Sequence, residues 1–162
     1  MKPVLYAASD GCPAFAHLIG VVGTIECGAC FPTHLGKLPH EQRDVVARFQ
    51  KLLLHQLRSE LRCFDWTLEY RPSSRRRDSI DIFGRGSESV IAIELDKPRA
   101  DQVAKKFVAR MAALPADVPV WFASVCYPGT ERMNKNECIK YFDYCNALSQ
   151  RLGGHYAGFI IQ

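Results

Sequence analysis

The chain has 162 residues, of which 48% are hydrophobic and 23% are charged, and its formal net charge is +4. These values are typical of one globular domain whose core needs neither disulfides nor metals to fold. No apolar run approaches the ~20 residues that cross a bilayer, and the first residues do not resemble a secretory signal. The seven cysteines are an odd number without dense spacing. We therefore expect a cytoplasmic protein with no membrane contact.

Residues 1–40 predict an irregular N-terminal extension. Residues 4–8 favour a short strand, but Gly20 and Gly23 interrupt the apolar run that follows, and three prolines favour loops. The extension also contains a Cys-x-x-Cys pair followed by a histidine, which is compatible with zinc ligands if a further Cys or His joins them. A single pair is a weak zinc signal, so buried cysteines are the preferred interpretation, with zinc and redox chemistry as alternatives. The residues concerned are Cys27, Cys30 and His34, with Cys12 or His17 as the fourth ligand.

From residue 40 onward the hydrophobic pattern predicts regular elements. Apolar residues at helical spacing predict an amphipathic helix over residues 40–62. Three strands, a helix, a strand, a helix and a last strand follow, bounded by prolines and glycines. Their predicted ranges are 66–71, 79–83, 89–96, 99–114, 120–126, 132–152 and 156–161.

The order α-β-β-β-α-β-α-β predicts an α/β fold in a single domain, with a mixed sheet and helices on both faces. The core of this domain is expected at residues 41–126, and residues 127–162 extend it by one helix and one strand.

Acidic residues gather on the second and third predicted strands. Because side chains alternate across a strand, Glu94 and Asp96 share one face, and Asp81 is expected on the same side. Three adjacent carboxylates repel one another unless a cation lies among them, and Mg²⁺ or Mn²⁺ prefers such oxygen ligands. Alternatively, each acid pairs with a nearby basic side chain. The basic residues at this edge of the sheet are Arg85, Lys97 and Arg99.

Glu60 is a further candidate, because a helical wheel of residues 40–62 places it in the middle of the apolar face. A glutamate that points at a sheet needs a charged partner. It either reaches the same metal site or, because it lies near the helix end, turns to solvent.

These features resemble the PD-(D/E)xK nuclease superfamily over roughly residues 41–126, in element order and in the short motifs DSIDIF and VIAIELDK. The resemblance implies that Asp81 and Glu94 bind the metal and that Glu60 adds an acid from the first helix. It also implies that Gln102 is the polar residue of the helix after the motif. The activity implied is Mg²⁺- or Mn²⁺-dependent hydrolysis of nucleic acid, DNA in the first instance.

One departure from the superfamily pattern concerns its lysine, which usually stands two residues after the glutamate. Asp96 occupies that place here, and Lys97 has the opposite parity unless a bulge turns it inward. The following helix offers Lys105 and Lys106, as in members whose lysine has moved there. The sequence does not decide among these four residues. It also leaves open a protein of the same fold that binds nucleic acid or a protein partner without cutting.

Basic residues are concentrated in the middle of the chain, with about 15 Lys and Arg against about 10 Asp and Glu over residues 43–110. Such side chains neutralise backbone phosphates, although a solvated basic face is the simpler interpretation. A homodimer is a further alternative, supported by apolar surface left on the last helix or the last strand. The candidate contacts to nucleic acid are Arg75, Arg76, Arg77, Arg85, Arg99, Gln102 and Lys105.

Overall fold

The computed structural model describes residues 1–28, 30–31, 37–73, 78–96, 100–127 and 134–162. The strands in this part of the chain are β1 (Pro3–Ala8), β2 (Asp65–Tyr70), β3 (Ile80–Arg85), β4 (Val90–Asp96), β5 (Val120–Cys126) and β6 (His155–Ile161). The helices are α1 (Pro13–Gly23), α2 (Pro39–Glu60), α3 (Asp101–Met111) and α4 (Lys135–Arg151).

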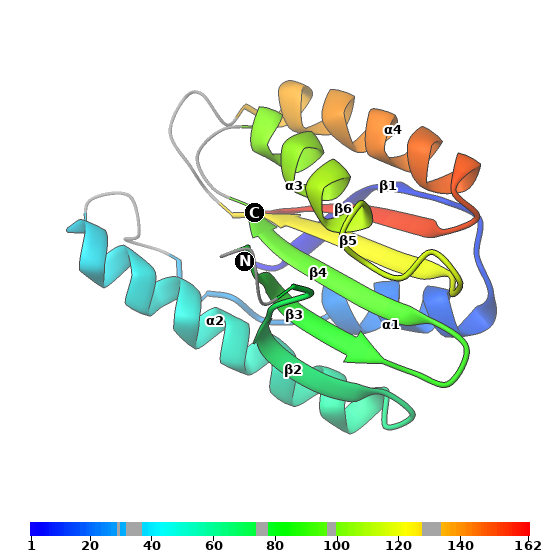
Figure 1. Cartoon of the computed structure of the whole chain (residues 1–162). Coiled ribbons are helices and arrows are strands. Elements are labelled where there is room, and N and C mark those ends of the chain that lie inside the picture. The colour runs from blue at the N-terminus through cyan, green and yellow to red at the C-terminus, as the bar shows by residue number, and fades with distance from the viewer. Residues whose placement is uncertain (29, 32–36, 74–77, 97–99, 128–133) are drawn as a thin grey trace.

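The six strands form one mixed sheet in the order β1-β6-β5-β4-β3-β2. The central strands β4, β5 and β6 are parallel, whereas β1, β2 and β3 run antiparallel to their neighbours. Helices α1 and α2 cover one face, and α3 and α4 cover the other (Figure 1). This arrangement confirms the predicted α/β fold class, and every element predicted after residue 40 is present with ends that differ by at most three residues.

Strand β4 shows how the sequence builds the core on both faces. All of its residues are buried, as expected for a central strand covered by helices. Ile91, Ile93 and Leu95 pack with α1 and α2, whereas Ala92 packs toward α3 and α4. Glu94 and Asp96 lie on the same face of the strand as Ala92. The strand therefore carries two carboxylates on the α3 side of the sheet just before it ends.

The N-terminal segment is more regular than the sequence predicts. β1 pairs with β6 at the sheet edge, and α1 buries Phe15, Leu18 and Val22 in the core. Pro13 suits the first turn of a helix, and the burial of apolar side chains outweighs the low helix propensity of glycine. A Cβ at Gly20 would meet no atom within 4 Å, so this glycine is not required by packing.

No helix in the described ranges combines the length and apolar character needed to cross a membrane.

Candidate functional site

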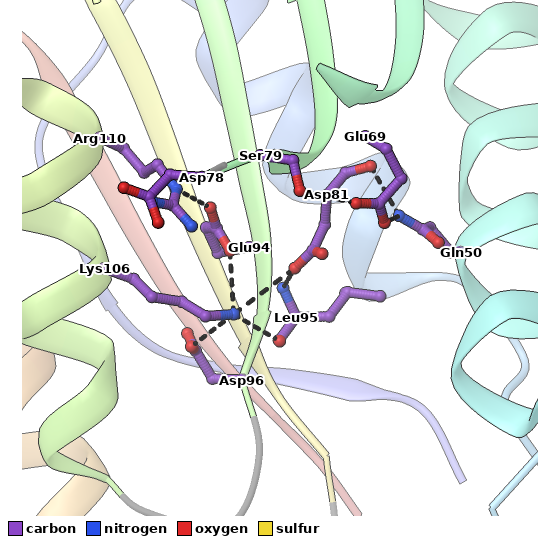
Figure 2. A network of polar contacts seen from close by, with 10 residues as sticks. All are labelled: Gln50, Glu69, Asp78, Ser79, Asp81, Glu94, Leu95, Asp96, Lys106 and Arg110. Atoms are coloured by element: carbon purple, nitrogen blue, oxygen red, sulfur yellow. Dashed lines mark hydrogen bonds and ion pairs between the residues drawn. The ribbon is translucent and has the colours of Figure 1, made fainter. Parts of the chain in front are cut away.

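Three carboxylates from two neighbouring strands meet on the α3 side of the sheet. The β3–β4 pairing sets Ile82 opposite Ile93, which brings Asp81 beside Glu94. Glu94 and Asp96 are 1% and 0% exposed, whereas the Asp81 side chain is 23% exposed. The structure therefore brings together the three acids that the sequence predicts as metal ligands (Figure 2).

The centre of this acidic cluster holds the ammonium group of Lys106. Its Nζ lies 2.9 Å from Glu94 Oε2, 3.3 Å from Asp96 Oδ1 and 3.6 Å from Asp81 Oδ2. It also donates a hydrogen bond of 3.0 Å to the carbonyl oxygen of Leu95. Lys106 is thus the lysine that α3 supplies to the acids, whereas Lys105 is exposed and pairs with Asp101 at 3.0 Å. Lys97 lies outside the described residues.

Arg110 forms the second cationic contact and is a residue that the sequence interpretation missed. Its Nε donates to Glu94 Oε1 at 2.6 Å, and its guanidinium lies 3.7 Å from Asp78. The available signal was spacing, because residues four apart on a helix lie on the same face, and Arg110 follows Lys106 by four. Glu94 is consequently paired through both of its oxygens, one to each cation.

Gln50 of α2 approaches the cluster from the opposite side and was also missed. Its Nε2 donates to the carbonyl oxygen of Asp81 at 2.7 Å and to Glu69 Oε1 at 2.9 Å. Ser79 donates to the other Glu69 oxygen at 2.7 Å. Glu69 has a φ of 49°, a left-handed backbone conformation that non-glycine residues seldom adopt. The sequence signal for Gln50 was a polar residue within the apolar face of a helix.

A cavity of about 480 Å³ opens beside Asp81 and Lys106, between α2 and α3. This position follows the carboxyl ends of parallel strands, where α/β folds usually bind ligands. The residues that line it are Arg43, Val46, Ala47, Gln50, Glu69, Asp81, Leu95, Gln102, Lys106 and Tyr127.

Burial and mutual repulsion change the ionisation of the acids. Burial, followed by the neighbouring charge of Glu94, raises the pKa of Asp81 to about 7, although Lys106 and the Leu95 N–H oppose this. Burial also raises the pKa of Asp96. Burial lowers the pKa of Lys106, but the three carboxylates together outweigh it and raise that pKa above its ordinary value. Lys106 therefore stays charged, and Asp81 titrates near neutrality.

The donor atoms of the cluster fit a divalent cation in their chemistry. The carboxylates of Asp81 and Glu94 and the Leu95 carbonyl are hard oxygen donors, and Nζ of Lys106 marks a point that all three approach. Both Asp96 carboxylate oxygens are buried, and the ion pair of Oδ1 with Lys106 at 3.3 Å is the contact that compensates them among the described residues. However, no group of three or more His, Cys, Asp or Glu side chains in this part of the chain has the spacing of a metal site. A divalent cation would have to take the position of the ammonium.

Glu60 does not join the cluster. It is the last residue of α2, its side chain is 44% exposed, and its carboxylate lies 4.0 Å from His17. A helical wheel gives the direction of a side chain around the helix axis but not its position along the axis. Gln50 is the residue of α2 that reaches the cluster, and Glu60 lies ten residues further on, about 15 Å along the helix. The solvent-facing alternative describes it correctly.

The predicted contacts to nucleic acid are distributed unevenly around the site. Gln102 lines the cavity, whereas Lys105 faces solvent. Arg85 ends β3 at the far side from Asp81 and donates to the hydroxyl of Tyr70 at 3.2 Å. The other arginines predicted to contact phosphate lie outside the described residues; these are Arg75, Arg76, Arg77 and Arg99.

Neither residue of the Cys27–Cys30 pair lines the cavity beside the acidic cluster. Cys27 is fully buried and its thiol donates to the carbonyl oxygen of Ile25 at 3.5 Å. Burial raises the pKa of Cys27 to about 12 and also raises the pKa of Cys30, so both thiols stay protonated at neutral pH. His34, the third predicted zinc ligand, lies outside the described residues.

The comparisons with known proteins returned no match: no family model, curated protein or solved structure is significantly similar to the chain. Its function is therefore inferred from the geometry of the cluster and the cavity.

Proposed function

We propose that the chain is a metal-dependent nuclease that hydrolyses phosphodiester bonds in nucleic acid, DNA in the first instance. One observation supports this function above the others. Asp81 and Glu94, from two adjacent strands, meet Lys106 of the following helix beside a cavity of about 480 Å³. Two carboxylates beside a cavity can supply ligands to a metal that activates water, and an amine can supply positive charge to the phosphate.

The residues of the cluster have separable roles in this proposal. Asp81, Glu94 and the Leu95 carbonyl would hold Mg²⁺ or Mn²⁺, which when bound lowers the pKa of water and polarises a phosphoryl oxygen. With the metal in the place of its ammonium, Lys106 would be released from the acids toward the cavity that it lines, where its charge would stabilise the negative charge that develops on the phosphate. Asp96 and Arg110 are positioning residues, because Asp96 contacts Lys106 at 3.3 Å and Arg110 holds Glu94 at 2.6 Å.

A second function is favoured by the position of Lys106. Its ammonium already contacts all three carboxylates, so the cluster is compensated without a metal. A protein with this cluster would keep the basic surface and bind nucleic acid, or a protein partner, without cutting it.

Cleavage assays distinguish the two functions. Wild type, Asp81→Asn and Glu94→Gln are compared on supercoiled plasmid and on single-stranded oligonucleotides, with MgCl₂ or MnCl₂. The exposed Glu88, in the turn before β4, provides the matched control Glu88→Gln. We expect a loss of about 100-fold or more for the two cluster variants and none for the control, because a lost transition-state contact of several kcal/mol corresponds to such factors.

Equal cleavage by all four proteins would exclude Asp81 and Glu94 from the reaction. Calorimetry provides the second measurement: nucleic-acid binding without any heat of Mg²⁺ or Mn²⁺ binding would favour the non-cutting alternative.

A further inference from the structure

The α2 wall of the cavity takes no part in the reaction proposed above. Arg43, Val46, Ala47 and Gln50 line this wall. Their spacing of three and four residues places them along one helix face, one turn after another. The opposite wall is formed by Gln102 and Lys106 of α3. The cavity thus has a reaction side and a second side whose chemistry is different.

Arg43 is the cation of the lining that remains open to an incoming anion. Its side chain is exposed and has no ion pair or hydrogen bond within the described part of the chain. Lys106, in contrast, is committed to three carboxylates. A guanidinium binds phosphate with two parallel hydrogen bonds, which gives it both charge and orientation.

The remaining lining matches the other parts of a nucleotide. Val46, Ala47 and Leu95 present apolar surface on which the face of a base can lie. Gln102 reaches only Asp101 among the described side chains, through a long contact of 3.4 Å, so its amide can bond the edge of a base. A volume of about 480 Å³ is that of a site for one small ligand and is too small for a base-paired segment.

We infer that this cavity takes one unpaired nucleotide of a nucleic acid strand, with its phosphate on Arg43 and its base between Gln102 and the apolar part of the α2 wall. The adjoining phosphodiester then lies at Asp81 and Lys106. This inference rests on the proposed function for the chemistry at the adjoining bond. The binding of the unpaired nucleotide does not require cleavage.

Fluorescence anisotropy in EDTA tests the binding separately from the reaction. The probes are a labelled single-stranded oligonucleotide of mixed sequence and a closed hairpin duplex of equal length, with a free mononucleotide as competitor. The variants are Arg43→Gln, Gln102→Leu and the control Arg48→Gln, an exposed arginine of α2 outside the cavity lining. Circular dichroism establishes that each variant is folded.

Arg43→Gln is expected to weaken binding of the single strand about 10-fold and to reduce the slope of log K against log salt by about 0.7, the loss of one phosphate contact. Gln102→Leu is expected to weaken it about 5-fold. Arg48→Gln should change the slope of log K against log salt less than Arg43→Gln does. The closed duplex should bind the wild type more weakly than the single strand does.

Three results would overturn the inference. These are equal losses for Arg43→Gln and Arg48→Gln, binding of the closed duplex as tight as that of the single strand, and competition by the mononucleotide at the same concentration as the oligonucleotide. If the wild type never cleaves but Arg43→Gln behaves as expected, the nuclease proposal fails and the nucleotide site remains. If the wild type cleaves and Arg43→Gln equals its control, the nucleotide site fails and the nuclease proposal remains.

Discussion

Two cavities of similar volume lie at opposite ends of β4. The one lined by Leu95, at the carboxyl end, encloses about 480 Å³, and the one lined by Ser89, just before the amino end, encloses about 400 Å³. The second is lined by aromatic rings, small residues and two exposed thiols, with Glu88 as its carboxylate. Only the first adjoins buried acids that depend on a shared cation. The two ends therefore differ in compensated buried charge and not in cavity volume, and this difference is the reason for placing the proposed site at the carboxyl end.

The largest expected effect comes from removing the shared cation. Lys106→Met leaves Glu94 and Asp96 buried with one counter-charge fewer, which should lower the free energy of unfolding by about 3–5 kcal/mol. Lys105→Met is the matched control, and its exposed pair should contribute less than about 1 kcal/mol. Urea denaturation at pH 8 measures both. Equal losses would show that the cluster does not depend on Lys106.

A pH titration of stability tests the acids themselves in metal-free buffer. Because the pKa of Asp81 is raised to about 7 in the folded state, the folded protein binds a proton that the unfolded chain releases at lower pH. The contribution of Asp81 to the free energy of unfolding is complete below pH 3.8, where both states are protonated. It is lost as the pH rises through about 7. Between pH 5 and 8, the free energy of unfolding of the wild type should fall by on the order of 2 kcal/mol. Asp81→Asn should flatten this profile, and an unchanged slope would contradict the assignment.

Gln50 tests the link between α2 and the cluster. Gln50→Leu removes the hydrogen bonds to Glu69 and to the Asp81 carbonyl, so we expect a loss of about 1–2 kcal/mol in the free energy of unfolding. Gln56→Leu, a half-buried position on the same helix, should change it by less than about 0.5 kcal/mol. Thermal denaturation measures the free energy of unfolding of both variants. Similar losses for the two would mean that the hydrogen bonds of Gln50 make no specific contribution to stability.

The smallest effect is expected at the amino end of β4. Glu88→Gln removes the carboxylate from the second cavity, and because this side chain is exposed, the free energy of unfolding should change by less than about 0.5 kcal/mol. Urea denaturation measures it. A loss comparable to that of Lys106→Met would remove the contrast between the two cavities.

Much of the fold could be predicted because local patterns and tertiary packing agree after residue 40. The alternation along β4 correctly placed Glu94 and Asp96 on one face, and the prolines and glycines between the apolar runs marked the ends of the elements to within three residues. Helix α1 was missed because Gly20 and Gly23 lower its helix propensity, while the burial that stabilises it is not visible in the sequence.

The site was less predictable because it depends on distances between elements. The sequence left four candidates for the residue that accompanies the acids, and the contact of Lys106 with Glu94 and Asp96 depends on how α3 packs on β4, which local sequence does not reveal. Glu60 was assigned to the cluster from its angle around the helix axis, but its position along the axis places it at the exposed end of α2. Gln50 and Arg110 bond to groups 31 and 16 residues away, so neither partner could be assigned from local sequence.

The main chain at Leu95 connects the acid and the amine of the cluster. Its N–H donates to Asp81 Oδ2 at 2.7 Å, and its carbonyl oxygen accepts from Lys106 at 3.0 Å. Both contacts belong to peptide groups, which every residue except proline carries in the same form. Exchanges among aliphatic residues of similar size at position 95 therefore leave the spacing between Asp81 and Lys106 intact. A substitution such as Leu95→Ile is therefore tolerated between the two buried acids, whereas neither acid can be exchanged for a neutral residue without changing the charge of the cluster.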